Sequence, residues 1–133
     1  MMRAIMNRSL AWTLLLLTCV VGLFPGSADA HHSFAMFDRS QQVKLEGVVK
    51  EFQFTNPHCW IQLLVTKDGA KEATEWTIEA LSPNVLGRQG WKRNTLKPGD
   101  RIVVLINPLR DGNPGGNLLT LTLPDGTTLG GGA

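Results

Sequence analysis

The stretch Glu75–Gly90, "EWTIEALSPNVLGRQG", contains the change of pattern that decides the fold. Apolar and polar residues at first alternate, which is typical of a β-strand with one buried face. Ser82 and Pro83 then supply an N-cap residue followed by a proline suited to the first helical turn. The sequence therefore predicts a strand over residues 73–80 and a short helix that ends near Gly90.

The same alternation occurs on both sides of this stretch, and turn residues separate the segments. We expect four further strands, at residues 43–54, 58–66, 101–107 and 117–123. Five strands in this order are typical of an OB-type barrel, whereas a sandwich would need about seven strands. The sequence therefore predicts an all-β protein, a small five-stranded OB-like barrel with one short helix between strands 3 and 4.

The predicted strand 73–80 should have one apolar face and one polar face, because successive side chains point to opposite sides of a strand. The residues expected to point inward are Trp76, Ile78 and Ala80. The residues expected to point outward are Glu75, Thr77 and Glu79. We interpret the two glutamates as part of a solvated face and not as a catalytic carboxylate pair.

Other segments carry more local predictions. Gly47, in the middle of the first strand, predicts a sharp bend or a bulge. Cys59 lies on an apolar strand face and is expected to be a buried small hydrophobe rather than a metal ligand. Residues 124–133 are expected to form a turn and a loose tail. Strict alternation in the last strand groups three leucines on one face, Leu119, Leu121 and Leu123.

The start of the chain has the pattern of a secretory signal peptide. Arg3 and Arg8 precede a short apolar run at residues 10–24, and the small residues of "SADA" follow. A basic start, a short apolar core and an Ala-x-Ala ending define such a peptide. The run is also short for a membrane span, which needs about 20 residues. We therefore predict a signal peptide over residues 1–30 and a periplasmic location.

Cleavage after Ala30 would leave residues 31–133 as a single OB-like β-barrel domain, since a chain of this length has no room for two. Cleavage after Ala28 and retention as an uncleaved anchor are the alternatives. Lipidation at Cys19 is disfavoured because Thr18 is large for the position before a lipidated cysteine.

The composition of the cleaved chain excludes several classes of protein. The first thirty residues contain two arginines and one aspartate, so their removal takes the net charge from +2 to +1. No basic face suggests nucleic acid. Cys59 is the only cysteine left, which rules out an intramolecular disulfide. We expect a monomer with no membrane contact after cleavage, whose partner, if any, is another periplasmic protein.

Two of the three histidines stand side by side in "ADAHHSF", residues 28–34. After cleavage behind Ala30, His31 would offer its free α-amine and its ring Nδ1, which close a chelate ring on a metal ion. One further imidazole completes a T-shaped site of three nitrogens, the histidine brace, and nitrogen ligands in a planar arrangement favour Cu(II). His58 is the expected partner, because Asn56 and Pro57 hold its approach extended.

The predicted cofactor is thus copper, bound by His31 and His58 with His32 as an alternate ligand. Cleavage after Ala28 would instead put His31 third from a free amine, which also chelates Cu(II), whereas an uncut chain has no free amine there. A disordered tail, with His58 bonding at a strand edge, is the competing interpretation. The residues expected to wall a site are Trp60, Asn56 and Met36, and those expected to staple the N-terminal segment onto the barrel are Phe34 and Phe37.

Three segments of the chain resemble a family of short exported bacterial proteins of unknown function. They are "HHSFAMFD" after the signal peptide, "GVVKEFQFTNPHCWIQL" and "SPNVLGRQGWKRNTLKPGDRIVV", so that the mature N-terminus HHSF and an NPHxW segment carry the resemblance. The position before Trp60 is not usually cysteine in this pattern. The resemblance implies a periplasmic location and a small β domain, and it brings no established activity.

The function that these observations favour is copper binding, delivery or buffering, more a binding protein than an enzyme. A metal-free periplasmic binding or interaction module is the alternative, with the barrel face or the loop at residues 107–117 as its contact surface. A brace-type copper oxidoreductase comes third, because no surface rich in aromatic residues and no supporting acid can be named for it.

Overall fold

The computed structural model describes residues 34–131 of the 133-residue chain. These residues form the strands β1 (Val43–Gln53), β2 (Trp60–Val65), β3 (Thr74–Glu79), β4 (Arg101–Pro108), β5 (Gly115–Thr122) and β6 (Thr128–Gly130), and the helix α2 (Pro83–Arg88). The predicted signal peptide, its predicted cleavage site, His31 and His32 lie outside the described residues.

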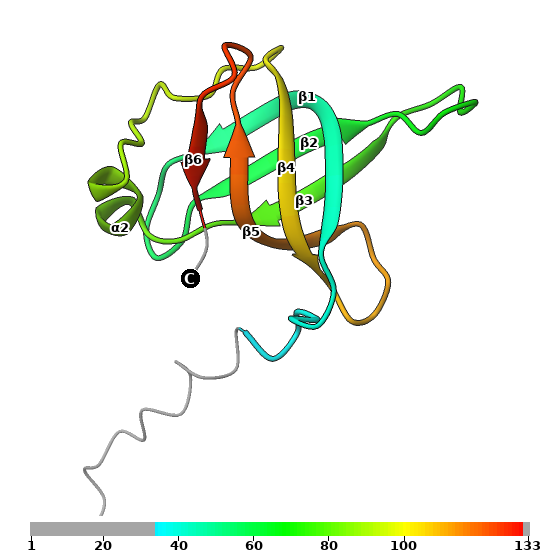
Figure 1. Ribbon diagram of the computed structural model, residues 1–133, viewed down its shortest axis with the longest axis horizontal. Helices are drawn as coiled ribbons and strands as arrows, with labels where there is room; N and C mark the ends of the chain where they lie inside the picture. The colour runs from blue at the N-terminus through cyan, green and yellow to red at the C-terminus, as the bar shows by residue number, and fades with distance from the viewer. Residues whose placement is uncertain (1–33, 132–133) are drawn as a thin grey trace, which may run out of the picture. The chain divides into compact units, whose positions relative to one another are not determined.

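The strands form a closed barrel, as Figure 1 shows. Their order is β3-β2-β1-β4-β5-β6, and the neighbours in this order are antiparallel. A parallel pairing of β3 with β5, in which Ile78 lies opposite Gly116, joins the two sides and closes five strands into a barrel. The short helix α2 stands between β3 and β4 in the chain, so the predicted fold class is confirmed.

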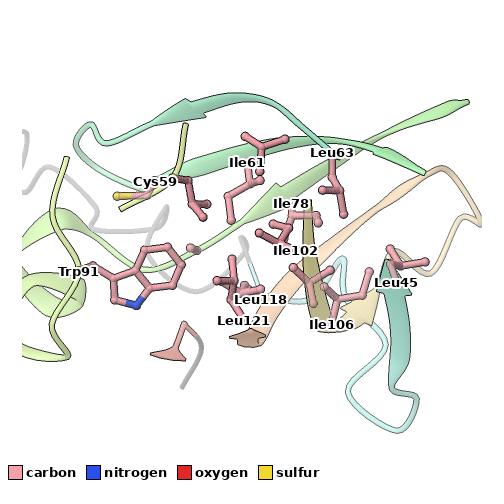
Figure 2. Close-up of a cluster of buried hydrophobic side chains, with 14 of the residues drawn as sticks. Leu45, Cys59, Ile61, Leu63, Ile78, Trp91, Ile102, Ile106, Leu118 and Leu121 are labelled. Atoms are coloured by element: carbon pink, nitrogen blue, oxygen red, sulfur yellow. The ribbon is translucent and has the colours of Figure 1, made fainter. Parts of the chain in front are cut away.

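The core of the barrel follows the predicted alternation in β2. Cys59, Ile61 and Leu63 are fully buried and point into the barrel, where they meet residues from every strand of the closed sheet (Figure 2). Leu86 of α2 and Trp91, which follows the helix, are buried in the same cluster. The inward positions of β3 are also as predicted for Ile78 and Ala80, and Trp76 packs against the core while half-buried.

The predicted grouping of three leucines in β5 is wrong, because this strand contains a β-bulge. Leu105 lies opposite Thr120 while Ile106 lies opposite Leu118, so Leu119 is an extra residue without a partner on β4. An extra residue reverses the alternation beyond it. Leu118 and Leu121 are consequently the fully buried leucines of this strand.

Gly47 in β1 is needed for close packing and not for a bulge. The bulge of this strand lies at Lys50, between the pairs Val49–Leu63 and Glu51–Gln62. A Cβ atom at Gly47 would lie 2.5 Å from the carbonyl oxygen of Leu64 on β2. At Gly47, β1 therefore lies closer to β2 than a residue with a Cβ atom would allow.

The C-terminal residues are part of the fold, and the prediction of a loose tail at residues 124–133 is wrong for the described part of it. Strand β6 pairs with the end of β5, where Gly130 lies opposite Thr120. The indole N–H of Trp91 donates a hydrogen bond of 2.7 Å to the carbonyl oxygen of Gly130. The backbone N–H of Gly131 donates a hydrogen bond of 3.0 Å to the carbonyl oxygen of Leu119, the extra residue of the β5 bulge.

The segment that leads into β1 is fastened to the β4–β5 hairpin. Phe37 is 3% exposed and forms a β-bridge with Leu109. The N–H of Arg110 donates to the carbonyl oxygen of Met36 at 2.9 Å. The predicted staple is confirmed for Phe37, whereas Phe34 is only half-buried and lies under the guanidinium of Arg39.

Candidate functional site

His58 stands immediately before β2 and is held in place by the end of the β2–β3 ladder. The N–H of Ala80 donates to the carbonyl oxygen of Cys59 at 2.9 Å, and the N–H of Cys59 donates to Leu81 at 3.2 Å. The backbone at His58 is thus a continuation of the strand, preceded by a cis Asn56–Pro57 peptide bond. Alternation puts the His58 side chain on the outer face of the barrel, where it is 29% exposed.

Glu79, the last residue of β3, is the partner of this histidine. Its Oε1 lies 2.5 Å from Nδ1 of His58, and its side chain is only 8% exposed. The prediction that Glu79 belongs to a solvated face is therefore wrong. Glu75, on the same face of β3, is exposed and pairs with Lys50 at 2.6 Å, as expected for a solvated position.

The burial of Glu79 has a cause that no local pattern contains. β5 pairs in parallel with β3 at this point, so that Asn117 lies opposite Glu79. On the other side, Trp60 of β2 lies opposite the same glutamate. The one hint in the sequence is that apolar residues flank Glu79 on both sides, Ile78 and Ala80.

The electrostatics of the pair follow from its burial. Removal from water raises the pKa of Glu79, and the neighbouring His58 lowers it in part. A buried carboxylate is costly unless it is hydrogen-bonded, and His58 supplies the bond. The same contact fixes the proton of the imidazole on Nδ1, which leaves Nε2 with a free lone pair. A histidine oriented in this way by a carboxylate is the usual form of a metal ligand in proteins.

A hollow of about 190 Å³ lies beside this pair, on the outside of the barrel. It is lined by Met36, Phe37, Trp60, Thr77, Glu79, Leu109 and Gly116. The structure therefore brings together two of the three predicted wall residues, Met36 and Trp60, with the carboxylate that holds His58. Asn56 is exposed and does not line the hollow.

The described residues do not contain a complete metal site by themselves. Among residues 34–131, no cluster of three or more His, Cys, Asp or Glu side chains could hold a metal ion. His58 and Glu79 form a pair, and the other predicted ligands, His31 and His32, fall outside this range. The predicted ligand set of three histidines stays a prediction.

Cys59 is separate from this pair although it follows His58 in the chain. Its side chain is fully buried in the barrel, 4.0 Å from the carbonyl oxygen of Thr55. Burial raises the pKa of the thiol. The predicted role of Cys59 as a small core residue agrees with this position, because a neutral, inward-pointing thiol cannot reach a ligand on the outer face.

A larger, open depression of about 500 Å³ lies on β1 and β2, and none of the predicted site residues lines it. Its rim carries charges of both signs, including the Glu46–Arg101 pair at 3.3 Å.

No helix in the described part of the chain is both long enough and apolar enough to cross a membrane.

Comparison with known proteins places the chain in a family. No curated protein and no solved structure matches it. A family model described as a family of unknown function, DUF6152, matches residues 20–118. This match spans most of the chain, and it includes the histidine pair at residues 31–32 as well as His58 and Glu79. The chain therefore belongs to DUF6152, a family of unknown function.

Proposed function

We propose that this protein binds copper in the periplasm, through the N-terminus of the processed chain and His58. The observation that carries the proposal is the contact of 2.5 Å between Nδ1 of His58 and the buried carboxylate of Glu79. This contact orients the ring and leaves Nε2 as the ligand atom. A histidine that merely bonded a strand edge would not need a buried glutamate to position it.

The fastening of the N-terminal segment supports the same proposal. Phe37 is anchored to Leu109, and Met36 lines the hollow beside Glu79. A chain that began at His31 would have three peptide units before Phe34, a reach of at most about 11 Å. A ligand on so short a tether acts at a high effective concentration wherever the tether spans the two sites, and the proposal requires that it reach Nε2 of His58.

The ligand atoms determine which metal suits the site. The α-amine and ring of His31 together with Nε2 of His58 give three nitrogen donors, and His32 offers a fourth. Nitrogen donors in a planar layout suit Cu(II), which also heads the affinity order of the divalent metals. The affinity should fall on acidification, because amine and imidazole nitrogens must lose their protons to bind. The corresponding task is copper binding, delivery or buffering.

The test is a calorimetric titration with Cu(II) of protein exported from a bacterial host, after its intact mass has established the cut. One copper per chain should bind tightly, and one extra residue before His31 should abolish this binding. Glu79→Gln should weaken the binding by roughly 10- to 100-fold. Glu75→Gln, on the same strand face but exposed, is the matched control and should leave the affinity unchanged.

Three results would count against the proposal. Equally weak binding with and without the extra residue would mean that the histidine pair only marks a processing site. That result would favour a metal-free binding module. Tight binding that survives both His58→Ala and Glu79→Gln would place copper on the N-terminal histidines alone. Reductant and oxygen consumption by the copper-loaded protein would point to the oxidoreductase instead.

A further inference from the structure

The carboxylate of Glu79 has capacity for a second partner. Within residues 34–131, its only hydrogen-bonding or ionic contact is the one between Oε1 and His58. A carboxylate accepts several hydrogen bonds through its two oxygens. Glu79 lines the hollow of about 190 Å³, and its side chain is 8% exposed. The hollow is therefore the place to look for a second partner of this carboxylate.

The rest of the hollow is apolar and aromatic. Trp60, Phe37, Leu109 and Met36 supply most of its wall. The one other polar side chain in the wall is Thr77, and its hydroxyl already donates to Gln62 at 2.8 Å. An occupant would therefore meet a single negative, hydrogen-bond-accepting group in an otherwise apolar and aromatic surrounding.

We propose that this hollow binds a small organic ammonium ion, a protonated amine with a short hydrocarbon group. The ammonium would donate to the free oxygen of Glu79, and a charge-assisted bond of this kind is about twice as strong as a neutral one. Trp60 lines the hollow, and the indole ring is the aromatic group that attracts organic cations most strongly. The hydrocarbon group would cover Met36 and Leu109.

The size of the hollow limits the ligand. A protein cavity of ~150 Å³ is known to hold a benzene molecule, and this hollow of about 190 Å³ is slightly larger. Amines with about four to six carbon atoms therefore fit. The inference does not depend on copper, because His58 is not among the residues that line the hollow.

The experiment is an NMR titration of the exported, metal-free protein in EDTA, with n-butylammonium as the probe. The indole N–H signals of Trp60, Trp76 and Trp91 are followed, and Trp60→Phe assigns the first. The Trp60 signal should shift in a saturable way, with a Kd on the order of 1 mM for so small a ligand. n-Butanol, which has the same hydrocarbon group and no charge, should bind at least tenfold more weakly.

Variants at Met36 test the role of Glu79 without changing it. Met36 is 50% exposed, so its replacement leaves the core intact. Met36→Lys would place an internal ammonium beside Glu79 and should abolish binding of the probe, whereas Met36→Leu keeps the apolar wall and should retain it. Glu79→Gln should also lose the probe, and Glu75→Gln should not.

Three outcomes would overturn the proposal. Equal binding of n-butanol and n-butylammonium would mean that the hollow recognises only hydrocarbon. The absence of any saturable shift at Trp60 would mean that no ammonium enters. Binding that appears only after the N-terminal amine has been acetylated would mean that the occupant is the terminus of the chain itself. The copper titration remains interpretable in each case, since it is made without an amine.

Discussion

At the scale of single residues, Glu79 is the position on which both the proposed copper site and the proposed ammonium site depend. A carboxylate removed from water costs folding free energy, and a protein without a use for it would gain from a neutral residue there. The neighbouring glutamate on the same face, Glu75, is exposed and has the ordinary surface partner Lys50. The contrast between two glutamates on one strand is the clearest indication of a functional site.

Glu79→Gln should change how stability depends on pH. Burial raises the pKa of Glu79 above its ordinary value of 4.5, so the unfolded chain releases this proton at lower pH than the folded one. The stability of the native protein therefore loses this contribution as the pH rises from 4.5 through the raised pKa. Glutamine does not titrate, and its amide oxygen can still accept the hydrogen bond that Nδ1 of His58 donates.

The free energy of unfolding of the Glu79→Gln variant, relative to that of the native protein, should therefore be higher at pH 7.5 than at pH 4. Urea titrations in EDTA at both pH values measure this difference, and the titrating groups that do not contact Glu79 cancel because both proteins contain them. A difference that shrinks with rising pH would show that His58 stabilises the ionised carboxylate by more than burial destabilises it.

At the scale of elements, the sequence predicts strands well and predicts their faces only as far as the first bulge. The alternation of Cys59, Ile61 and Leu63 is regular, and the structure follows it. In β5 the extra residue Leu119 shifts the pattern, and nothing in a run of leucines and threonines reveals where the extra residue stands. Bulges depend on the partner strand, which local periodicity does not describe.

Gly47→Ala should destabilise the barrel, because the added methyl group would meet the Leu64 carbonyl oxygen at 2.5 Å and the Leu63 side chain at 2.9 Å. The backbone of β2 cannot be displaced as a flexible side chain can, so β1 would have to move away from β2. We expect a loss of about 1–3 kcal/mol in the free energy of unfolding, as for other overpacked positions.

Gly87→Ala is the matched control for this variant. Gly87 lies in α2, and no atom outside the helix lies within 4 Å of the added Cβ. Alanine is the better helix former by about 0.8–1 kcal/mol, so the control should be at least as stable as the native protein. Denaturation in urea compares the two, and equal stability of both variants would contradict the close approach at Gly47.

At the scale of the whole molecule, the barrel is closed by contacts that are distant in sequence. The number and order of the first five strands and the place of the helix could be predicted from periodicity and turn residues. The parallel pairing of β3 with β5 could not be read in this way, and it is this pairing that buries Glu79. The sequence therefore indicated His58, Trp60 and Met36 as candidates. It did not indicate Glu79, which contacts His58 and lines the same hollow as Trp60 and Met36.

Removal of the C-terminal strand should loosen the molecule. A chain that ends at Pro124 loses β6, the bond from the Trp91 indole to Gly130 and the bond from Gly131 to Leu119. Buried hydrogen bonds contribute about 1 kcal/mol each, and the apolar surface uncovered beneath them adds to the loss. The melting temperature should fall by roughly 10 °C or more for a domain of this size.

A chain that ends at Gly131 keeps all of these contacts and serves as the control. Differential scanning calorimetry at one protein concentration compares the two lengths with the full chain. Equal melting temperatures for all three would mean that β6 adds nothing to the closed barrel.

The parallel pairing of β3 with β5 also sets the order in which the molecule can fold. The residues Ile78 and Gly116 that meet in it are separated along the chain by α2 and β4. Contacts of such high contact order form late, after the local hairpins. Glu79 is thus buried, and the hollow completed, only when nearly the whole chain has been synthesised and arranged. A ligand that needs this site would not bind to any partly folded intermediate. Binding of such a ligand would therefore measure how much of the protein has reached the native state.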